Sequence, residues 1–178
     1  MFDPEHFVAQ CDAAVLAGGG AAEVCELLAP VVANSAAIIA ALGEPVRMGL
    51  QVLHQSQRLT IINLAWRSTF IGRPHNHLMW AVIGVYGGRE DNMFWRRCPP
   101  DAGRPIEAVG ARSLVTGDAC ELQDDIIHSV TNPLGKLTAG IHIYGGDFFA
   151  PGKSHWNGEM LLEERRQHGP VYRSLSEG

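Results

Sequence analysis

The sequence predicts a mainly β protein, a sandwich or barrel of short strands that follows a helical N-terminal part. Residues 1–48 are rich in alanine and carry helix start and stop signals. From about Gly49 the chain changes to short β-like runs separated by glycine, proline and asparagine, which is typical of all-β sandwiches and barrels. No repeat or low-complexity linker divides the 178 residues, so we expect one domain with a sizeable core.

The N-terminal part is expected to contain three helices. Asp3 has the residue type and position of an N-cap, with a proline in the first turn after it. The glycines at 18–20 end that helix. A second helix is expected over residues 21–28, ending before Pro30 because proline lacks the donor that a helix interior needs. The third is expected over residues 31–42.

The β part contains six candidate strands. They are predicted over residues 59–66, 78–86, 92–97, 119–123, 128–131 and 137–144. Residues 163–166, with the sequence Glu-Glu-Arg-Arg, are expected to form the charged face of a short helix. The chain is thus divided into a helical part over 1–48, a β core over 49–150 and a C-terminal extension over 151–178.

Composition narrows the classes of partner. The net charge of −5 argues against nucleic acid as a main partner, and no apolar run is long enough to span a membrane. The N-terminus is acidic and lacks the basic region of a signal peptide. Four cysteines are scattered without a C-x-x-C pair, which predicts free thiols in a reducing cytoplasm. The sequence does not predict an oligomeric state.

Three histidines are the most informative side chains. His75 and His77 stand at i and i+2 in the run Pro-His-Asn-His, so on a β-strand both point to the same face. His128 lies in another predicted strand and is followed four residues later by Asn132. None of the five positions directly after His77 is acidic. Because imidazole is a common metal ligand, the sequence predicts an all-histidine metal site made of His75, His77 and His128.

The ligand set indicates what such a site can do. Imidazole suits iron, zinc, copper and nickel, so the ligand type does not identify the metal. Three neutral ligands leave the full charge of a divalent ion in place, which favours an anionic ligand and lowers the pKa of a bound thiol. Three protein ligands also leave coordination positions open, as catalytic sites require. The pattern therefore favours a catalytic centre.

The motifs around these histidines resemble those of the cupin-fold thiol dioxygenases. The resemblance covers roughly residues 50–150 and rests on Pro-His-Asn-His at 74–77, the run from Trp80 to Glu90, Gly-Asp at 117–118, residues 127–132 and residues 141–145. The bacterial 3-mercaptopropionate dioxygenases are closer than the animal cysteine dioxygenases. The resemblance implies a cupin double-stranded β-helix, a jelly-roll barrel, with helices packed at its N-terminal side. It also implies Fe(II) on the three histidines and an iron-dependent oxidoreductase. Its substrates would be O2 and a small thiol carboxylate, 3-mercaptopropionate or cysteine, with the sulfinate as product.

The same resemblance assigns roles to residues outside the ligand set. His142 and Tyr144, again at i and i+2, are expected to form a catalytic pair beside the metal, with the Tyr144 hydroxyl near the substrate or O2. Lys153 is the nearest match to the basic residue that binds the substrate carboxylate. Trp80 is expected to contribute to the substrate-binding wall.

The sequence also departs from the family pattern. Gly140 stands where the family usually has serine, which removes the hydrogen bond that would orient His142. Lys153 keeps a positive charge but lacks the two-pronged carboxylate geometry of arginine. No cysteine lies between His77 and Gly88, which excludes the cysteine–tyrosine crosslink of the animal enzymes.

Three functions remain open at this point. The first is the thiol dioxygenase. The second is a cupin metalloenzyme that uses the same three histidines on a non-thiol small molecule, an alternative that Gly140 and Lys153 favour. The third is a non-catalytic cupin that binds a metal or small ligand as a sensor. The open coordination positions make the third the weakest of the three.

Overall fold

The computed structural model describes residues 1–67 and 72–165, so the last part of the expected C-terminal extension, residues 166–178, lies outside the described residues. Three helices come first: α1 Pro4–Leu16, α2 Ala21–Val32 and α3 Ser35–Leu42. The strands are β1 Gly49–Gln55, β2 Thr60–Trp66, β3 His75–Asn76, β4 Ala81–Gly87, β5 Arg89–Arg97, β6 Ile106–Val115, β7 Ala119–Leu122, β8 Ile127–Thr131, β9 Thr138–Tyr144, β10 Ser154–Trp156 and β11 Glu163–Arg165.

The strands form two antiparallel sheets whose order defines the fold. One sheet has the order β1-β2-β9-β4-β7 and the other β11-β10-β3-β8-β5-β6. Strands β2 to β9 form one long hairpin. In it β5 pairs with β6, β4 with β7, β3 with β8 and β2 with β9. The hairpin is rolled up, because β4 also pairs with β9 and β5 with β8. This order is a double-stranded β-helix, the cupin jelly roll, and confirms the predicted fold class.

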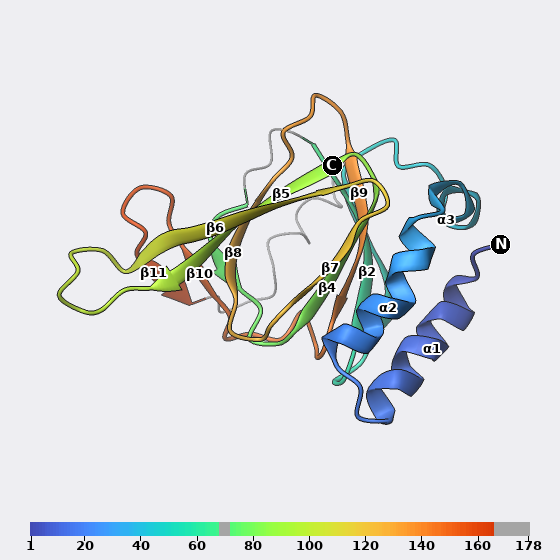
Figure 1. Ribbon diagram of the computed structural model, residues 1–178, viewed down its shortest axis with the longest axis horizontal. Coiled ribbons are helices and arrows are strands. Elements are labelled where there is room, and N and C mark those ends of the chain that lie inside the picture. The colour runs from blue at the N-terminus through green and yellow to red at the C-terminus, as the bar shows by residue number, and fades with distance from the viewer. Residues whose placement is uncertain (68–71, 166–178) are drawn as a thin grey trace.

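The helices cover the outer face of the five-stranded sheet (Figure 1). Helix α2 packs against β4 and β7, and its Leu28 and Val32 are fully buried there. Gly84 in β4 makes this approach possible, because a Cβ at that position would lie 2.7 Å from both Leu28 and Val32. The helical layer thus buries one face of the sheet and leaves the other face for the barrel interior.

The starts of α1 and α2 follow the sequence closely, whereas α3 begins at Ser35 and not at residue 31 as expected. Asp3 caps α1 as predicted, accepting hydrogen bonds from the backbone N–H groups of Glu5 and His6. The prediction that the second helix stops before Pro30 was wrong, because α2 runs on to Val32. Pro30 lies inside the last turn and removes one helical hydrogen bond there, yet the helix continues to the buried Val32.

The predicted strands all exist with small shifts at their ends, but the prediction missed several others. Strands β1, β3, β6 and β10 were not expected. The predicted short helix at 163–166 was wrong over its described residues, because 163–165 form strand β11. Strand pairing with β10 and the contact of Glu163 with Arg97 at 2.6 Å stabilise the extended form there. Residue 166 lies outside the described residues.

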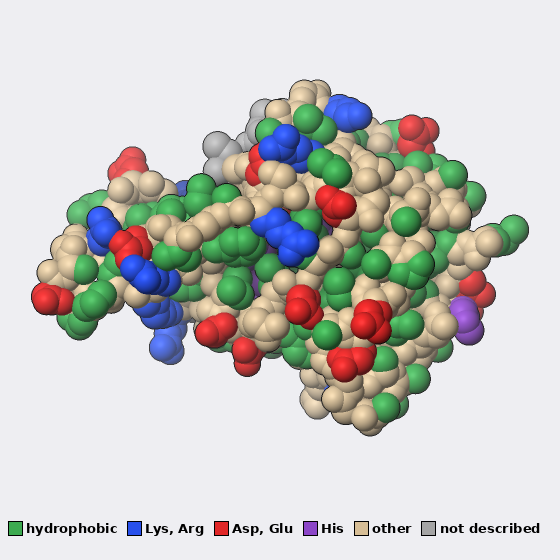
Figure 2. Space-filling view, viewed as in Figure 1, with side chains coloured by type: hydrophobic (Ala, Val, Ile, Leu, Met, Phe, Trp, Pro, Cys, Tyr) green, Lys and Arg blue, Asp and Glu red, His purple; other side chains and the backbone are tan. Residues whose placement is uncertain are grey.

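The β5–β6 hairpin projects away from the helical layer (Figure 1). Basic and acidic side chains are interspersed over this end of the molecule in Figure 2. Arg96 lies 2.7 Å from Glu107, which also pairs with Arg104. These exposed pairs contribute little to stability individually, so the hairpin depends mainly on strand pairing.

Two predictions from composition can be compared with the structure. Cys11, Cys25, Cys98 and Cys120 are all free, as predicted. In the part of the chain that the structure describes, no single helix is long and apolar enough to cross a membrane. Taken together, α2 and α3 pass that test by length and composition, with a bend of 87° between them.

Candidate metal centre

The structure brings His75, His77 and His128 together inside the barrel. His75 lies on β3 and pairs in register with His128 on β8, and His77 follows β3 directly. Each ring offers a nitrogen, and these atoms all lie within 4.8 Å of one another. All three side chains are buried. Among residues 1–67 and 72–165 this is the one cluster of three histidine, cysteine or acidic residues with that geometry.

Hydrogen bonds orient two of the rings toward a common centre. The Nδ1 of His75 lies 2.8 Å from the carbonyl oxygen of Arg73, and the Nδ1 of His128 lies 2.8 Å from Oδ1 of Asn92. An oxygen acceptor at Nδ1 keeps the proton there, so the lone pair is on Nε2. Both rings therefore turn a metal-binding nitrogen toward the cluster.

The arrangement fits a metal ion in distance and in charge. The Nε2 atoms of His77 and His128 are 2.9 Å apart. Two metal–nitrogen bonds of about 2.0–2.1 Å at a right angle separate their nitrogens by about 2.9 Å. Burial and the neighbouring histidines hold the pKa of His77 and of His128 well below 6.5, so their lone pairs are available at neutral pH. The structure thus contains a three-histidine metal-binding group.

The three rings open onto a small internal cavity of about 20 Å³. Its lining joins both sheets: Leu64 and Trp66 on β2, Glu90 on β5, Val130 on β8, His142 and Tyr144 on β9, and the three histidines. A volume of this size holds little more than one water-sized molecule. A larger ligand would need side chains at the cavity to move.

The predicted pair on β9 does face the histidines. The Tyr144 ring lies 4.9 Å from the His77 ring, and Tyr144 Oη is 3.4 Å from Nδ1 of His142. His142 also meets Trp66 edge to face at 5.6 Å. Burial lowers the pKa of His142 to about 4, so its ring is neutral at physiological pH. The two side chains therefore form a neutral, hydrogen-bonding wall opposite the ligands.

Sequence reasoning missed two residues of this site, Glu90 and Asn92. Both point inward from β5, are buried, and are joined by a hydrogen bond of 2.8 Å from Asn92 Nδ2 to Glu90 Oε1. Burial raises the pKa of Glu90 to about 7. The Glu-x-Asn spacing, in which the two residues alternate with the half-buried Arg89 and Asp91, is the sequence signal that could have revealed them.

The glycine at position 140 has a structural explanation. A Cβ there would lie 2.8 Å from the carbonyl oxygen of Gly84 and 3.2 Å from Nε2 of His142. A serine would therefore crowd both the neighbouring strand and the ring. Instead, Oε2 of Glu90 lies 3.7 Å from that nitrogen. In this chain a carboxyl group from the opposite sheet faces His142.

Lys153 lies at the edge of the site and is buried. The next residue, Ser154, begins β10, and its N–H donates to Oδ1 of Asn76, which lies between His75 and His77 in the sequence. Lys153 Nζ donates to the carbonyl oxygens of Asp147 and Ala150 at 3.2 and 2.8 Å. Its charge contributes to the lowered pKa of His77. Lys153 therefore places a buried cation near the ligand cluster, although it does not line the cavity.

Trp80, the other predicted substrate-binding residue, is placed elsewhere. It packs against the core that the helices cover, and it is not among the described residues that line the cavity. Its indole lies over Gly145, where an added Cβ would be 2.0 Å from Cε2 of the ring. The structure does not bring Trp80 together with the histidines.

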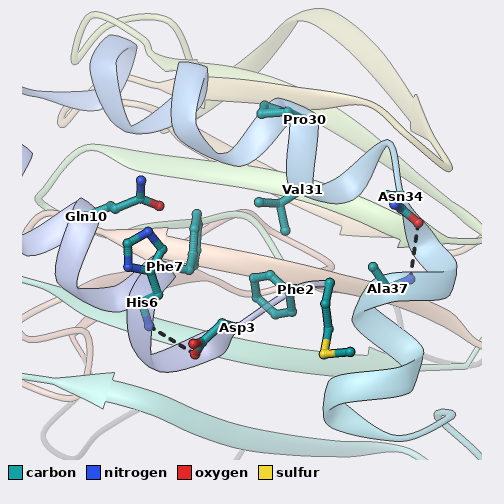
Figure 3. Close-up of a pocket in the computed structure, with 10 residues that line it drawn as sticks. Phe2, Asp3, His6, Phe7, Gln10, Pro30, Val31, Asn34 and Ala37 are labelled. Atoms are coloured by element: carbon teal, nitrogen blue, oxygen red, sulfur yellow. Dashed lines mark hydrogen bonds between the residues drawn. The ribbon is translucent and has the colours of Figure 1, made fainter.

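A larger hollow of about 260 Å³ lies between α1 and the α2–α3 segment (Figure 3). Phe2, Phe7 and Val31 supply much of its lining. Two of the polar side chains shown there are used as helix caps: Asp3 accepts from the His6 N–H and Asn34 from the Ala37 N–H. This hollow therefore has the character of a groove between helices.

Comparisons with known proteins return only distant similarities. No protein-family model matches the chain. Similar solved structures include an uncharacterized conserved protein with a double-stranded β-helix domain from Klebsiella pneumoniae, at 13% identity over 60% of this chain and 76% of that chain, with TM-score 0.43. An RmlC-like cupin family protein from Methanocaldococcus jannaschii is 7% identical over 56% of this chain and 81% of that chain, with TM-score 0.45. The DMSP lyase DddQ from Ruegeria pomeroyi is 15% identical over 57% of this chain and 48% of that chain, with TM-score 0.42. At these values no activity carries over to this chain.

Proposed function

We propose that this protein is a non-haem Fe(II) thiol dioxygenase that acts on a small thiol carboxylate, 3-mercaptopropionate or cysteine. In this reaction both atoms of O2 are added to sulfur, RSH + O2 → RSO2H. Sulfur loses the four electrons that oxygen gains, so no further reductant is needed. When bound, the metal would supply a Lewis acid that binds the thiolate and activates O2.

The observation that carries the proposal is the charge of the site. Its three metal-binding side chains are neutral imidazoles, and the buried cation Lys153 lies near them. A divalent ion at the ligands would add two further positive charges that no carboxylate ligand cancels. A thiolate joined to a carboxylate provides two negative charges at a short separation, which suits such a site.

The remaining residues have roles that follow from their positions. Tyr144 lies beside His77 and turns its hydroxyl toward His142, so it can hold a hydrogen bond at the cavity wall. Phe148 stacks on Tyr144 with ring centroids 4.1 Å apart and fixes the plane of that ring. The apolar side chains Leu64 and Val130 also line the cavity.

The proposal is tested by measuring O2 consumption and sulfinate formation by iron-loaded protein. Three thiols are offered in parallel: 3-mercaptopropionate, cysteine, and cysteamine, which lacks a carboxylate. We expect sulfinate to appear in step with O2 loss, with both carboxylates preferred over cysteamine. In Lys153→Met the KM for the carboxylates should rise about tenfold, equivalent to 1.4 kcal/mol, while cysteamine is unaffected. Lys136→Met, at an exposed lysine, is the matched control.

Two results would count against this function. Iron bound stoichiometrically with no thiol-dependent O2 uptake would favour the second candidate, a cupin metalloenzyme acting on a non-thiol small molecule. Equal turnover of cysteamine and 3-mercaptopropionate, unchanged in Lys153→Met, would contradict the role of the carboxylate.

A further inference from the structure

The two carboxyl oxygens of Glu90 face two different parts of the site. We call the contact of Oε1 the first arm and the contact of Oε2 the second arm. Oε1 accepts a hydrogen bond from Asn92, and Oε2 faces Nε2 of His142 at 3.7 Å. The carboxyl group is fully buried. Among the described buried polar atoms, Oε2 of Glu90 and Nε2 of His142 both lack a hydrogen-bond partner. Two such atoms that face each other are natural partners for one proton.

The first arm of Glu90 controls a metal ligand through Asn92. An amide group has an acceptor on one side and donors on the other. While Glu90 Oε1 accepts from the Asn92 NH2 group, the amide oxygen must face Nδ1 of His128, and this keeps the His128 proton on Nδ1. A reversed amide would donate to Nδ1 and leave the proton on Nε2, the nitrogen that faces the metal-binding cluster.

The second arm of Glu90 controls the His142–Tyr144 pair. A hydroxyl at Oε2 would donate to Nε2 of His142, so that the ring carries its proton on Nδ1 and donates to the Tyr144 oxygen. The Tyr144 oxygen is then the acceptor of that hydrogen bond. Gly140 leaves the space beside Nε2 that this approach requires.

We propose that Glu90 is a positioning residue that sets the tautomers of His128 and His142 together, through Asn92 on one side and through Oε2 on the other. The neutral carboxyl is the form that suits both arms, since it has one acceptor and one donor. Burial supports that form by raising the pKa of Glu90 to about 7 and lowering that of His142 to about 4, so both groups are mainly uncharged between these pH values. The inference uses the proposed metal centre but does not depend on thiol as substrate.

The test is carried out on the metal-free full-length protein. Ring ¹⁵N NMR of histidine-labelled protein reports the tautomers of His128 and His142, and isothermal titration with Co²⁺ or Zn²⁺ reports metal affinity. Glu90→Gln keeps an acceptor and a donor and should preserve both tautomers. Glu90→Leu should shift both rings toward Nε2–H or a mixture and weaken metal binding about 10- to 100-fold. Glu121→Leu, at an exposed glutamate on β7, is the control.

Asn92→Leu separates the two arms. It should change the tautomer of His128 and leave that of His142 as in the wild type. Glu90→Met replaces Glu90→Leu where the latter does not fold, and Asn92→Leu carries the test if neither does. The proposal is overturned if the apolar Glu90 variants leave both tautomers and the metal affinity unchanged, or if Asn92→Leu changes His142 as much as His128. Failure of the thiol dioxygenase assay would leave these NMR outcomes unaffected.

Discussion

The two sheets contribute unequal halves to the site. The six-stranded sheet carries His75, His128, Asn92 and Glu90, which are connected by hydrogen bonds of 2.8 Å to one another or to the backbone. The five-stranded sheet presents an apolar inner face, on which His142 lies in register between Ile62 and Ile83. Its polar contribution to the cavity is His142 and Tyr144.

This difference suits each sheet to a different role in the proposed enzyme. A metal ligand needs its ring fixed before the ion arrives, and the hydrogen-bonded side provides that. A group that assists a reacting molecule benefits from apolar surroundings, where one hydrogen bond is stronger and water is scarce. The inner face of the five-stranded sheet has that character. Substitutions on the six-stranded sheet should therefore lower metal affinity, and substitutions on the five-stranded sheet should lower kcat.

The largest effect is expected when a metal ligand on the six-stranded sheet is substituted. His128→Ala should lose metal affinity by more than about 100-fold, because even changes behind the ligands cost 10- to 100-fold. Tyr144→Phe, on the other sheet, should bind metal within about threefold of the wild type and lose roughly 100-fold in kcat. Calorimetric metal titration and steady-state O2 consumption measure the two effects. A Tyr144→Phe variant that fails to bind metal would remove the distinction between the sheets.

The next effect concerns pH and the buried carboxyl of Glu90. Burial raises its pKa from 4.5 to about 7, so the folded protein keeps this proton at pH values where the unfolded chain has lost it. The wild type therefore loses stability relative to Glu90→Gln as pH rises from below 4.5 to above 7, by about 3 kcal/mol in total. Urea unfolding of both metal-free proteins across this range measures the difference. A gap that stays constant with pH would show that the carboxyl does not titrate in this window.

The smallest effect should arise on the helix-covered side and leave the site intact. Gly84→Ala puts a methyl group 2.7 Å from Leu28 and Val32, and overpacking of this kind costs about 1–3 kcal/mol. Metal affinity should not change, because α2 lies on the outer face of the sheet. Gly110→Ala on β6, where nothing lies within 4 Å, is the matched control and should leave the thermal midpoint nearly unchanged. Loss of metal binding in Gly84→Ala alone would mean that the helical layer shapes the ligand cluster.

The sequence predicted the part of the site that depends on spacing. His142 and Tyr144 share a face of β9 by the period of two. The same spacing predicted that His75 and His77 lie together, although β3 ends at Asn76, and His128 needed only to lie on an adjacent strand. The predicted strands were recognised where side chains are apolar and buried, as in β4 and β9. Strand β6 was missed because its middle is exposed and carries few strand-forming residues.

What the sequence did not predict depends on tertiary contact. Polar residues fill every position from Arg89 to Asn92, so the strand period does not show which face of β5 points inward. Glutamate is also rarely fully buried, so the sequence contained no reason to place Glu90 inside. Likewise Glu163 suggested a helix by its spacing from an arginine, whereas its actual partner is Arg97 on a strand distant in sequence. Trp80 is the opposite case: it lies close to the ligand motif in the sequence, but it packs on the outer side of the barrel.

The rolled hairpin also has a consequence for the order of folding. His77 and His128 are 51 residues apart, and their strands meet only after β4 to β7 have turned back on themselves. Such nonlocal pairing is slow because the loop-closure entropy is lost before the contacts form. A complete set of ligands therefore exists only late on the pathway. We expect added metal to slow unfolding while leaving the refolding rate nearly unchanged. The ion would then stabilise the barrel after it has folded and would not direct its folding.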